Sequence, residues 1–436
     1  MTLDLTKGNI LKGLILFSLP MIVGNILQQL YNIADTLIVG QVLGKDALAA
    51  VGSAYSLMTF LTSVFLGLSM GAGALFSIYY GKQEKEKLKN SIAHGFILIV
   101  IITIIINILV FVLLDKILVF LKTPDKLYVS MRDYLFFIFM GLLPVSIYNF
   151  FACLLKALGN SLTPLYFLAF STILNIGLDL LFVISFDMGI KGAAIATIIS
   201  QFLSALFIVI YFYIKCKDLI IDRFVFDISY IKELLNMSSL TCLQQSTMNF
   251  GILMIQRLIN SFGAVVMAGF AAAIKIDTFA YLPVQDFGNA FSSFVAINYG
   301  ANKKDRIKEG FRISIITACI FAIIISILVN IFSKNLMNIF ISKEEIEVIN
   351  EGVKYLRIEG SFYFGIAILF LLYGYYRAIK KPLMSFILTI ISLGLRVLLA
   401  YLLSPYIGTS GIYLAIPIGW FMADLFGLLY KKIRMN

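Results

Sequence analysis

The chain has little charge for its size. Only 14% of its 436 residues are charged, whereas 60% are hydrophobic, and the mean hydropathy is +0.95. A soluble protein of this length needs far more charged side chains to cover its surface. Hydrophobic runs long enough to cross a bilayer recur along the whole sequence, and no segment between them is typical of a separate soluble domain. The sequence therefore predicts an all-α polytopic membrane protein.

Residues that serve metal, redox or nucleophilic chemistry are scarce. The only histidine is His94, and the four cysteines show no metal-type spacing. They lie in or beside apolar segments, which is typical of small hydrophobic residues that stay reduced. We find no nucleophile–base set, metal motif or phosphate-binding loop, so the sequence argues against an enzyme and predicts no cofactor. The cysteines are Cys153, Cys216, Cys242 and Cys319.

Hydrophobic runs separated by loop signals predict twelve membrane spans. Several exceed the ~20 residues that a helix needs to cross hydrocarbon, so we expect tilted or kinked helices. The predicted spans are 12–41, 47–80, 90–114, 130–156, 161–185, 190–214, 230–261, 264–300, 307–332, 348–378, 382–404 and 408–430.

Lysine and arginine are concentrated in alternate connections between these spans. Lys82 and Lys85 precede the third span, and Lys303 and Lys304 precede the ninth. This bias predicts that both termini and the basic connections lie on the cytoplasmic side of the cell (inner) membrane. The net charge of +11 therefore reflects topology and contact with anionic lipid, and it does not indicate a nucleic-acid partner.

The two halves of the chain are related by a constant shift. Gly44 corresponds to Gly263, 219 residues later, and further pairs keep this spacing. Each half holds six spans, so both halves have the same orientation, and two such lobes around a cavity are typical of transporters. We expect a monomer with an N-lobe (1–214, spans 1–6), a cytoplasmic linker (215–229) and a C-lobe (230–436, spans 7–12).

Charged groups at membrane depth are costly and usually mark a function or an ion pair. Span direction predicts that Asp35, Asp179 and Thr197 all lie in the outer third of the membrane, and Asn175 shares a helix face with Asp179, four residues away. This oxygen-rich cluster could bind a proton or Na⁺. Alternatively, it is a hydrogen-bonded group that fixes helix packing.

The second half lacks this cluster and carries other charges. Lys275, Asp277 and Arg396 lie at a similar outer depth, either as a packed ion network or as part of a substrate surface. Asp286, in a span kinked by proline, is expected to contact the cavity. Asp424 lies near the inner interface, where we expect it to be solvated or to snorkel.

The first span contains a proline and polar residues. Pro20 bends the helix, either as a static kink or as a hinge whose bending follows the charge state of Asp35. Gln28 and Tyr31 of this span, with Asn149 of the fourth, are candidates to line a cavity. The sequence is also rich in Phe, Tyr and Met, whose surfaces adapt to varied ligands.

These features resemble the multidrug and toxic compound extrusion (MATE) family of the MOP superfamily. The segment YNIADTLIVGQVLG (31–44) is similar to the family's asparagine-x-x-aspartate segment, and INYGANKKDRI (297–307) is similar to its asparagine-x-glycine-alanine ending. LLKALGNSLTPL (154–165) looks like the family's basic–glycine–threonine–proline signature, although Ser161 replaces the usual acidic residue. The resemblance covers nearly the whole chain, with two sets of six spans and a long inner linker.

The resemblance implies an antiporter that is coupled to H⁺ and/or Na⁺. Such a protein exports amphipathic, often cationic, organic compounds by alternating access between two lobes. In the prokaryotic branch with a cation site in the N-lobe, the matching positions here are Asp35, Asn175, Asp179 and Thr197 for the cation, Gln28, Tyr31 and Asn149 near the cavity, and Pro20 as the bending proline.

Another branch of the family relies on carboxylates in the C-lobe. Here the seventh span offers Gln244, Gln245 and Asn249 instead, and we expect no deep acid in the tenth span. The resemblance therefore argues against coupling in the C-lobe.

The alternative function is a flippase for lipid-linked saccharides, from the same superfamily. That function implies a strongly cationic cavity in both lobes and often extra spans. Twelve predicted spans and an acidic first half disfavour it.

Overall fold

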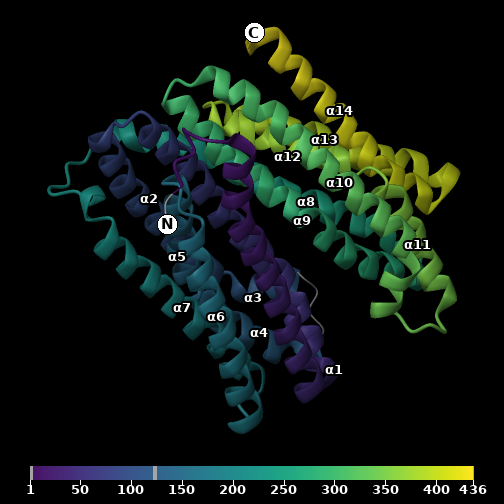
Figure 1. The fold of residues 1–436 in the computed structure, drawn as a ribbon. Coiled ribbons are helices and arrows are strands. Elements are labelled where there is room, and N and C mark those ends of the chain that lie inside the picture. The colour runs from purple at the N-terminus through teal and green to yellow at the C-terminus, as the bar shows by residue number, and fades with distance from the viewer. Residues whose placement is uncertain (1–2, 121–124, 436) are drawn as a thin grey trace. The chain divides into compact units, whose positions relative to one another are not determined.

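The computed structural model describes residues 3–120 and 125–435, and nearly all of them are helical (Figure 1). The prediction of an all-α membrane protein is confirmed. The elements are α1 (Ile10–Gly81), α2 (Lys85–Val112), α3 (Leu114–Phe120), α4 (Asp125–Met140), α5 (Leu142–Ala157), α6 (Leu162–Asp179), η1 (Leu180–Ser185), α7 (Gly189–Lys215), η2 (Lys217–Leu219), α8 (Ile228–Asn260), α9 (Ala264–Gly300), α10 (Lys304–Phe340), α11 (Ile346–Gly360), α12 (Tyr363–Ala378), α13 (Pro382–Ile407) and α14 (Thr409–Met435).

Most of these helices are membrane spans by length and composition. Within the described residues, nine helical segments, two of them in α1, are long and apolar enough to cross a membrane, and there are up to eleven spans if each of two bent pairs forms one. The bent pairs are α4 with α5, at 41°, and α11 with α12, at 53°. Helix α8 has 33 residues and occupies the place of the seventh predicted span, but Gln244, Gln245 and Asn249 make it more polar than the others.

A glycine with positive φ separates the first two spans of each half. Gly44 has φ 82° and ψ −175° inside α1, and Gly263 has φ 94° and ψ 175° between α8 and α9. Glycine reaches this region of backbone space without the strain that a Cβ atom causes. The same conformation at positions 219 residues apart supports the internal repeat.

Residue contacts divide the chain into two compact units. Unit 1 contains Met1–Asp4 and Leu19–Cys242, and unit 2 contains Leu5–Ser18 and Leu243–Asn436. The chain therefore passes from one unit to the other three times: between Asp4 and Leu5, before α1 begins, and then inside α1 and inside α8. It does not change unit in the linker between α7 and α8. The lobe boundaries derived from the repeat stay a prediction.

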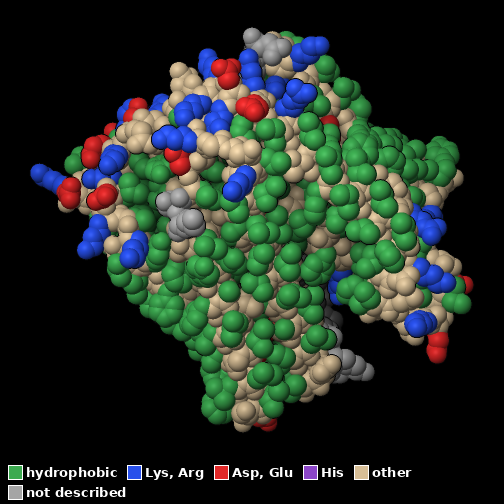
Figure 2. Space-filling view, viewed as in Figure 1, with side chains coloured by type: hydrophobic (Ala, Val, Ile, Leu, Met, Phe, Trp, Pro, Cys, Tyr) green, Lys and Arg blue, Asp and Glu red, His purple; other side chains and the backbone are tan. Residues whose placement is uncertain are grey.

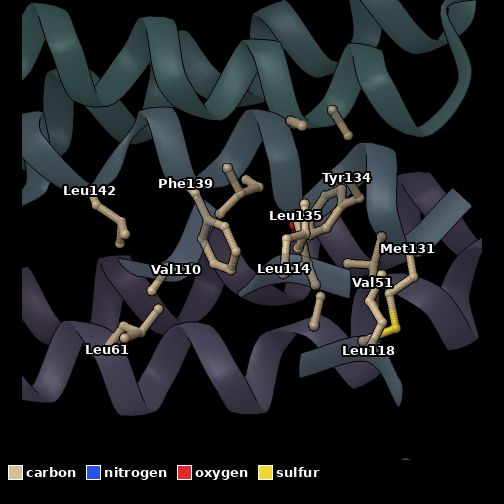
Figure 3. Packing of buried hydrophobic residues seen from close by; sticks show 14 of the residues in the cluster. Val51, Leu61, Val110, Leu114, Leu118, Met131, Tyr134, Leu135, Phe139 and Leu142 are labelled. Atoms are coloured by element: carbon tan, nitrogen blue, oxygen red, sulfur yellow. The ribbon is translucent and has the colours of Figure 1, made fainter. Parts of the chain in front are cut away.

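One of the core clusters of unit 1 is built mainly from apolar faces of α1, α2, α3, α4 and α7. Figure 3 shows part of it: Tyr134, Leu135 and Phe139 of α4 gather with Val51 and Val110. Fully burying a large apolar side chain contributes roughly 1.5–3 kcal/mol. This packing holds α4 beside the helices that carry the candidate site.

Charged side chains are unevenly distributed on the face drawn in Figure 2. Within unit 1, Lys and Arg gather around the start of α2, whereas hydrophobic side chains cover most of the surface below them. Such a hydrophobic surface suits contact with lipid chains.

Two glycines of α1 let the start of α8 approach closely. A Cβ atom added at Gly71 would lie 2.5 Å from the Cα of Ser238, and one added at Gly67 would lie 2.5 Å from the Cα of Cys242. Small residues at such crossings allow two helix backbones to pack without intervening side chains. This contact ties the first half of α8 to unit 1.

The linker before α8 is anchored on the buried ring of His94. The His94 Nε2 accepts a hydrogen bond from the Asp227 backbone N–H at 3.0 Å, so the ring hydrogen lies on Nδ1 and is donated to the Asn90 carbonyl oxygen at 2.7 Å. Asp227 caps α8, because its Oδ1 accepts from the Ser229 N–H at 2.8 Å. The hydrogen bonds from Ser229 lower the pKa of Asp227.

The close crossing of α1 and α8 predicts a large effect of one added methyl group. Gly71→Ala is expected to lower the free energy of unfolding by about 1–3 kcal/mol, because the new Cβ meets the backbone of α8. Gly394→Ala is the matched control, since its Cβ would meet nothing within 4 Å. Thermal unfolding in detergent measures both, and equal midpoints would contradict this account of the crossing.

The anchor on His94 predicts protease resistance of the linker. His94→Ala removes the acceptor of the Asp227 N–H, and tryptic cleavage after Lys217 or Arg223 is expected to speed up roughly fivefold, for about 1 kcal/mol of lost hydrogen bonding. Ser91→Ala is the control, because the buried Ser91 hydroxyl has no partner among the described residues. Unchanged cleavage in His94→Ala would show that the ring does not hold the linker.

Candidate cation site

Four polar residues predicted from the sequence meet in unit 1. The Tyr31 hydroxyl of α1 lies 3.2 Å from the Thr197 hydroxyl of α7. With its amide oriented to satisfy both neighbours, Asn175 of α6 donates to Asp179 Oδ2 at 2.9 Å and accepts from the Thr197 backbone N–H at 3.2 Å. Three helices therefore converge on one group of oxygen atoms.

Asp35 lies close enough to this group for its carboxyl to interact electrostatically with that of Asp179. Both are buried: Asp35 is 8% exposed and Asp179 is 0% exposed. The Oδ1 atom of each has no hydrogen-bond partner in the described part of the chain, and no Lys or Arg there acts on either carboxyl. Two ionised carboxylates without a countercharge are strongly disfavoured at such a site, so it favours a bound proton or cation.

Sequence reasoning missed two features of this site. The Tyr134 side chain of α4 is buried and interacts electrostatically with both Asp35 and Asp179. The helix also widens to a π-helix at Leu180–Ser185, directly after Asp179. Wide turns of this kind often occur at functional sites. Neither feature leaves a clear signal in the hydrophobic pattern.

Small residues position Thr197. Ala193, Ala194 and Ala196 precede it on α7, and all are buried. Side chains of this size let neighbouring helices pack closely. The threonine hydroxyl therefore reaches Tyr31 from a helix that packs directly on α6.

The other predicted cavity residues do not join this cluster. Gln28 is exposed, and the Asn149 amide donates back to the Val145 carbonyl of its own helix at 2.9 Å. In unit 2, Asp286 is buried, whereas Lys275 is exposed, with its ammonium 5.9 Å from the Phe340 ring centroid. Their assignment to a substrate cavity stays a prediction.

The predicted ion network of the second half contains a second carboxyl group. Glu359 of α11 is only 3% exposed and interacts with Asp277 and Arg396, so the expectation that the tenth span has no deep acid was wrong. The hydroxyls of Tyr355 and Tyr363 face Asp277. The network thus joins α9, α11, α12 and α13, and Lys275 forms no ion pair with it among the described residues.

The expectation for Asp424 was also wrong. It is neither solvated nor snorkelling, because only 5% of its surface is exposed. Its position near the end of the last span suggested the interface, but burial depends on which face of α14 it occupies, and that face packs on α12 and α13.

Pro20 lies within α1, next to the point at which the chain changes unit. The first segment of unit 2 ends at Ser18, and the long segment of unit 1 begins at Leu19. A proline here leaves the carbonyl one turn earlier without its helical donor. The interpretation of Pro20 as a hinge is therefore compatible with the division of contacts.

The fold and the buried acidic cluster define a polytopic transporter. The MatE family model matches residues 20–181 and 241–402, one copy in each half. The chain belongs to this family of membrane transport proteins, so the resemblance inferred from the sequence motifs is confirmed.

Individual relatives agree over nearly the full length. The probable multidrug resistance protein YpnP of Bacillus subtilis (strain 168) is 33% identical over 436 residues, which cover 98% of this chain and 96% of the relative. A transporter of the MOP superfamily from Pyrococcus furiosus shares the fold, with a TM-score of 0.93 at 23% identity over 99% of this chain and 97% of that one. A multidrug resistance MATE family transporter solved in an outward-facing conformation gives the same score, identity and coverage.

The bonds of Asn175 predict a measurable loss of stability. Asn175→Leu leaves Asp179 Oδ2 without its donor, and the free energy of unfolding is expected to fall by about 1–3 kcal/mol. Asn149→Leu, which loses only a bond to its own helix, is expected to change it by no more than about 0.5 kcal/mol. Thermal unfolding in detergent measures both, and a loss no larger in Asn175→Leu than in Asn149→Leu would contradict the geometry.

Proposed function

We propose that this protein is a multidrug efflux antiporter that is driven by H⁺, Na⁺ or both. The observation that carries the proposal is the pair of buried carboxyl groups, Asp35 and Asp179, with oxygen atoms that have no partner among the described residues. YpnP, named as a probable multidrug resistance protein, supports the export of drugs. The substrates are amphipathic and often cationic organic compounds.

The coupling ion binds within the cluster around Asp179. A proton neutralises one carboxyl group and removes the repulsion between the two. Na⁺ does the same through the oxygen atoms of Asp35, Asp179, Asn175 and Thr197, which are hard ligands suited to an alkali cation. The chain itself provides every group that either ion requires.

Alternating access follows from unequal binding of the ion in two conformations. The ion stabilises the conformation in which Asp35 and Asp179 lie together, and drug binding favours the ion-free conformation. Pro20 bends α1 as the carboxyl groups gain or lose their countercharge. The residues that we expect to contact the substrate are Gln28, Tyr31 and Asn149 of unit 1, and Lys275 and Asp286 of unit 2.

The bias of basic residues supports an orientation in the cytoplasmic membrane with both termini inside. Basic residues before α2 and α10 then face anionic lipid of the inner leaflet. The protein works as a monomer, because each chain contains both repeats that a central cavity requires.

Neutral substitutions in the cluster are expected to uncouple transport. Asp35→Asn and Asp179→Asn should each abolish export of a fluorescent organic cation from proteoliposomes with imposed H⁺ or Na⁺ gradients, because an amide neither releases a proton nor compensates a cation. Asp218→Asn, on the exposed η2 turn, should leave export unchanged.

Imposing the two gradients separately identifies the ion. Export that responds only to the proton gradient assigns H⁺, and export that responds only to the sodium gradient assigns Na⁺. Export that is still driven by the gradient in folded Asp35→Asn protein would contradict the proposed coupling of transport to this site.

A further inference from the structure

The last span contains a buried carboxyl group that does not belong to the Asp35–Asp179 cluster. Asp424 lies on α14, seven residues before Lys431. This separation corresponds to about 10 Å along a helix, so Asp424 lies well inside the apolar part of the span. Asp424 is 95% buried within unit 2, where α14 packs on α11, α12 and α13.

Neither oxygen of this carboxyl group has a hydrogen-bond partner in the described part of the chain. Among the described residues, Asp424 is the only buried side chain with two carboxyl oxygens that both lack a hydrogen-bond partner. Asp179, in contrast, accepts from Asn175, and Asp277 interacts with Arg396. An ionised carboxylate in such surroundings lacks both water and a countercharge, which is costly at membrane depth.

Among the described residues, the ionisable groups that act on Asp424 do not supply a positive charge, and the buried Arg377 of α12 donates instead to Ser292 and Asn289 of α9. Cys319 of α10 and Tyr373 of α12 interact with it electrostatically, and both are neutral in their ordinary form. Lys431, on the same helix, places its ammonium 3.8 Å from the Phe311 ring centroid instead. These neighbours favour a carboxyl group that carries its own proton.

Charged groups on α13 and α11, the other two helices that pack on α14, lie at other positions along α14 than Asp424. Arg396 of α13 lies beside Gly419, five residues before Asp424. On α11, Glu351 accepts from the Tyr413 hydroxyl at 2.8 Å, and Lys354 donates to the Thr409 hydroxyl at 2.7 Å, both near the start of α14. Arg396, Glu351 and Lys354 each interact with a group near their own position along α14 or α13, and these positions are more than one helical turn from Asp424.

A polar recess provides a place for a proton to go. Tyr373 lines a small recess in unit 2, with room for about one water molecule, together with Gln244, Gln245, Asn289 and Arg377. The Gln244 side chain is buried, and its Oε1 has no partner among the described residues. Tyr373 therefore contributes to the recess and also interacts with Asp424.

We propose that Asp424 is a second proton-carrying residue, which binds and releases a proton on the Tyr373 side during transport. The proton leaves the Asp424 carboxyl for a water or a substrate group in the recess and returns when the recess empties. This inference rests on the proposed transport function but assigns a site outside the Asp35–Asp179 cluster. Proton binding would then occur in both units.

Labelling of the wild-type protein tests whether Asp424 holds a proton. A hydrophobic carbodiimide reacts with protonated carboxyl groups in apolar surroundings, and mass spectrometry locates the adduct. We expect Asp424 to be labelled in proteoliposomes at neutral pH and the labelling to decline as the pH rises. Absence of label on Asp424 under conditions that label Asp179 would overturn the proposal.

Transport by variants separates proton exchange from packing. Asp424→Asn has nearly the size of the protonated acid and is expected to lower the number of protons moved per substrate and to flatten the pH profile, whereas Asp424→Glu restores both. An unchanged proton count and pH profile in Asp424→Asn would show a packing residue and overturn the proposal. Should Asp424→Asn fail to fold, Asp424→Glu and the labelling of wild type decide in the same way.

The two proposals fail in different experiments. Retained gradient-driven export in Asp35→Asn contradicts coupling in unit 1 and does not alter the pH dependence of labelling at Asp424. Loss of label at Asp424 leaves the effect of Asp35→Asn intact.

Discussion

The cost of an uncompensated charge away from water governs this molecule. In hydrocarbon, backbone groups must find their partners within the chain, which accounts for an almost wholly helical structure. Ionisable side chains obey the same rule by three different solutions. Asp277 and Glu359 face Arg396, the pair Asp35 and Asp179 requires a proton or a cation, and Asp424 has neither a partner nor a countercharge in the described chain. The first solution lies within the protein, whereas the proposed function assigns a mobile ion to the other two.

Much of the fold can be predicted from the sequence because its signals are local. Long hydrophobic runs give the spans, and Gly44 and Gly263 mark equivalent breaks because only glycine adopts this backbone conformation without strain. The spacing of Asn175 and Asp179 places both on one helix face, and span direction brings Asp35 and Thr197 to the same depth. These arguments use distances along a helix, which the sequence determines directly.

The remainder depends on which face of a helix each residue occupies, and on how helices pack. Asp424 is buried although its position near the end of the last span suggested the interface, and Glu359 is buried in a span for which we expected no deep acid. A charged residue in a hydrophobic run shows its depth along the helix but not its neighbours. Tyr134 joins the acidic cluster through tertiary packing. The division of α1 and α8 between two units likewise comes from contacts that a hydrophobic profile does not contain.

The passage of the chain from one unit to the other inside two helices has a mechanical consequence. A loop bends through a continuous range at little cost, but a helix resists bending until backbone hydrogen bonds are exchanged or lost. Two of the three crossings between the units, Ser18–Leu19 and Cys242–Leu243, lie within continuous helical turns. Such joints favour a few discrete conformations separated by a barrier, and they disfavour a continuous range of intermediate positions.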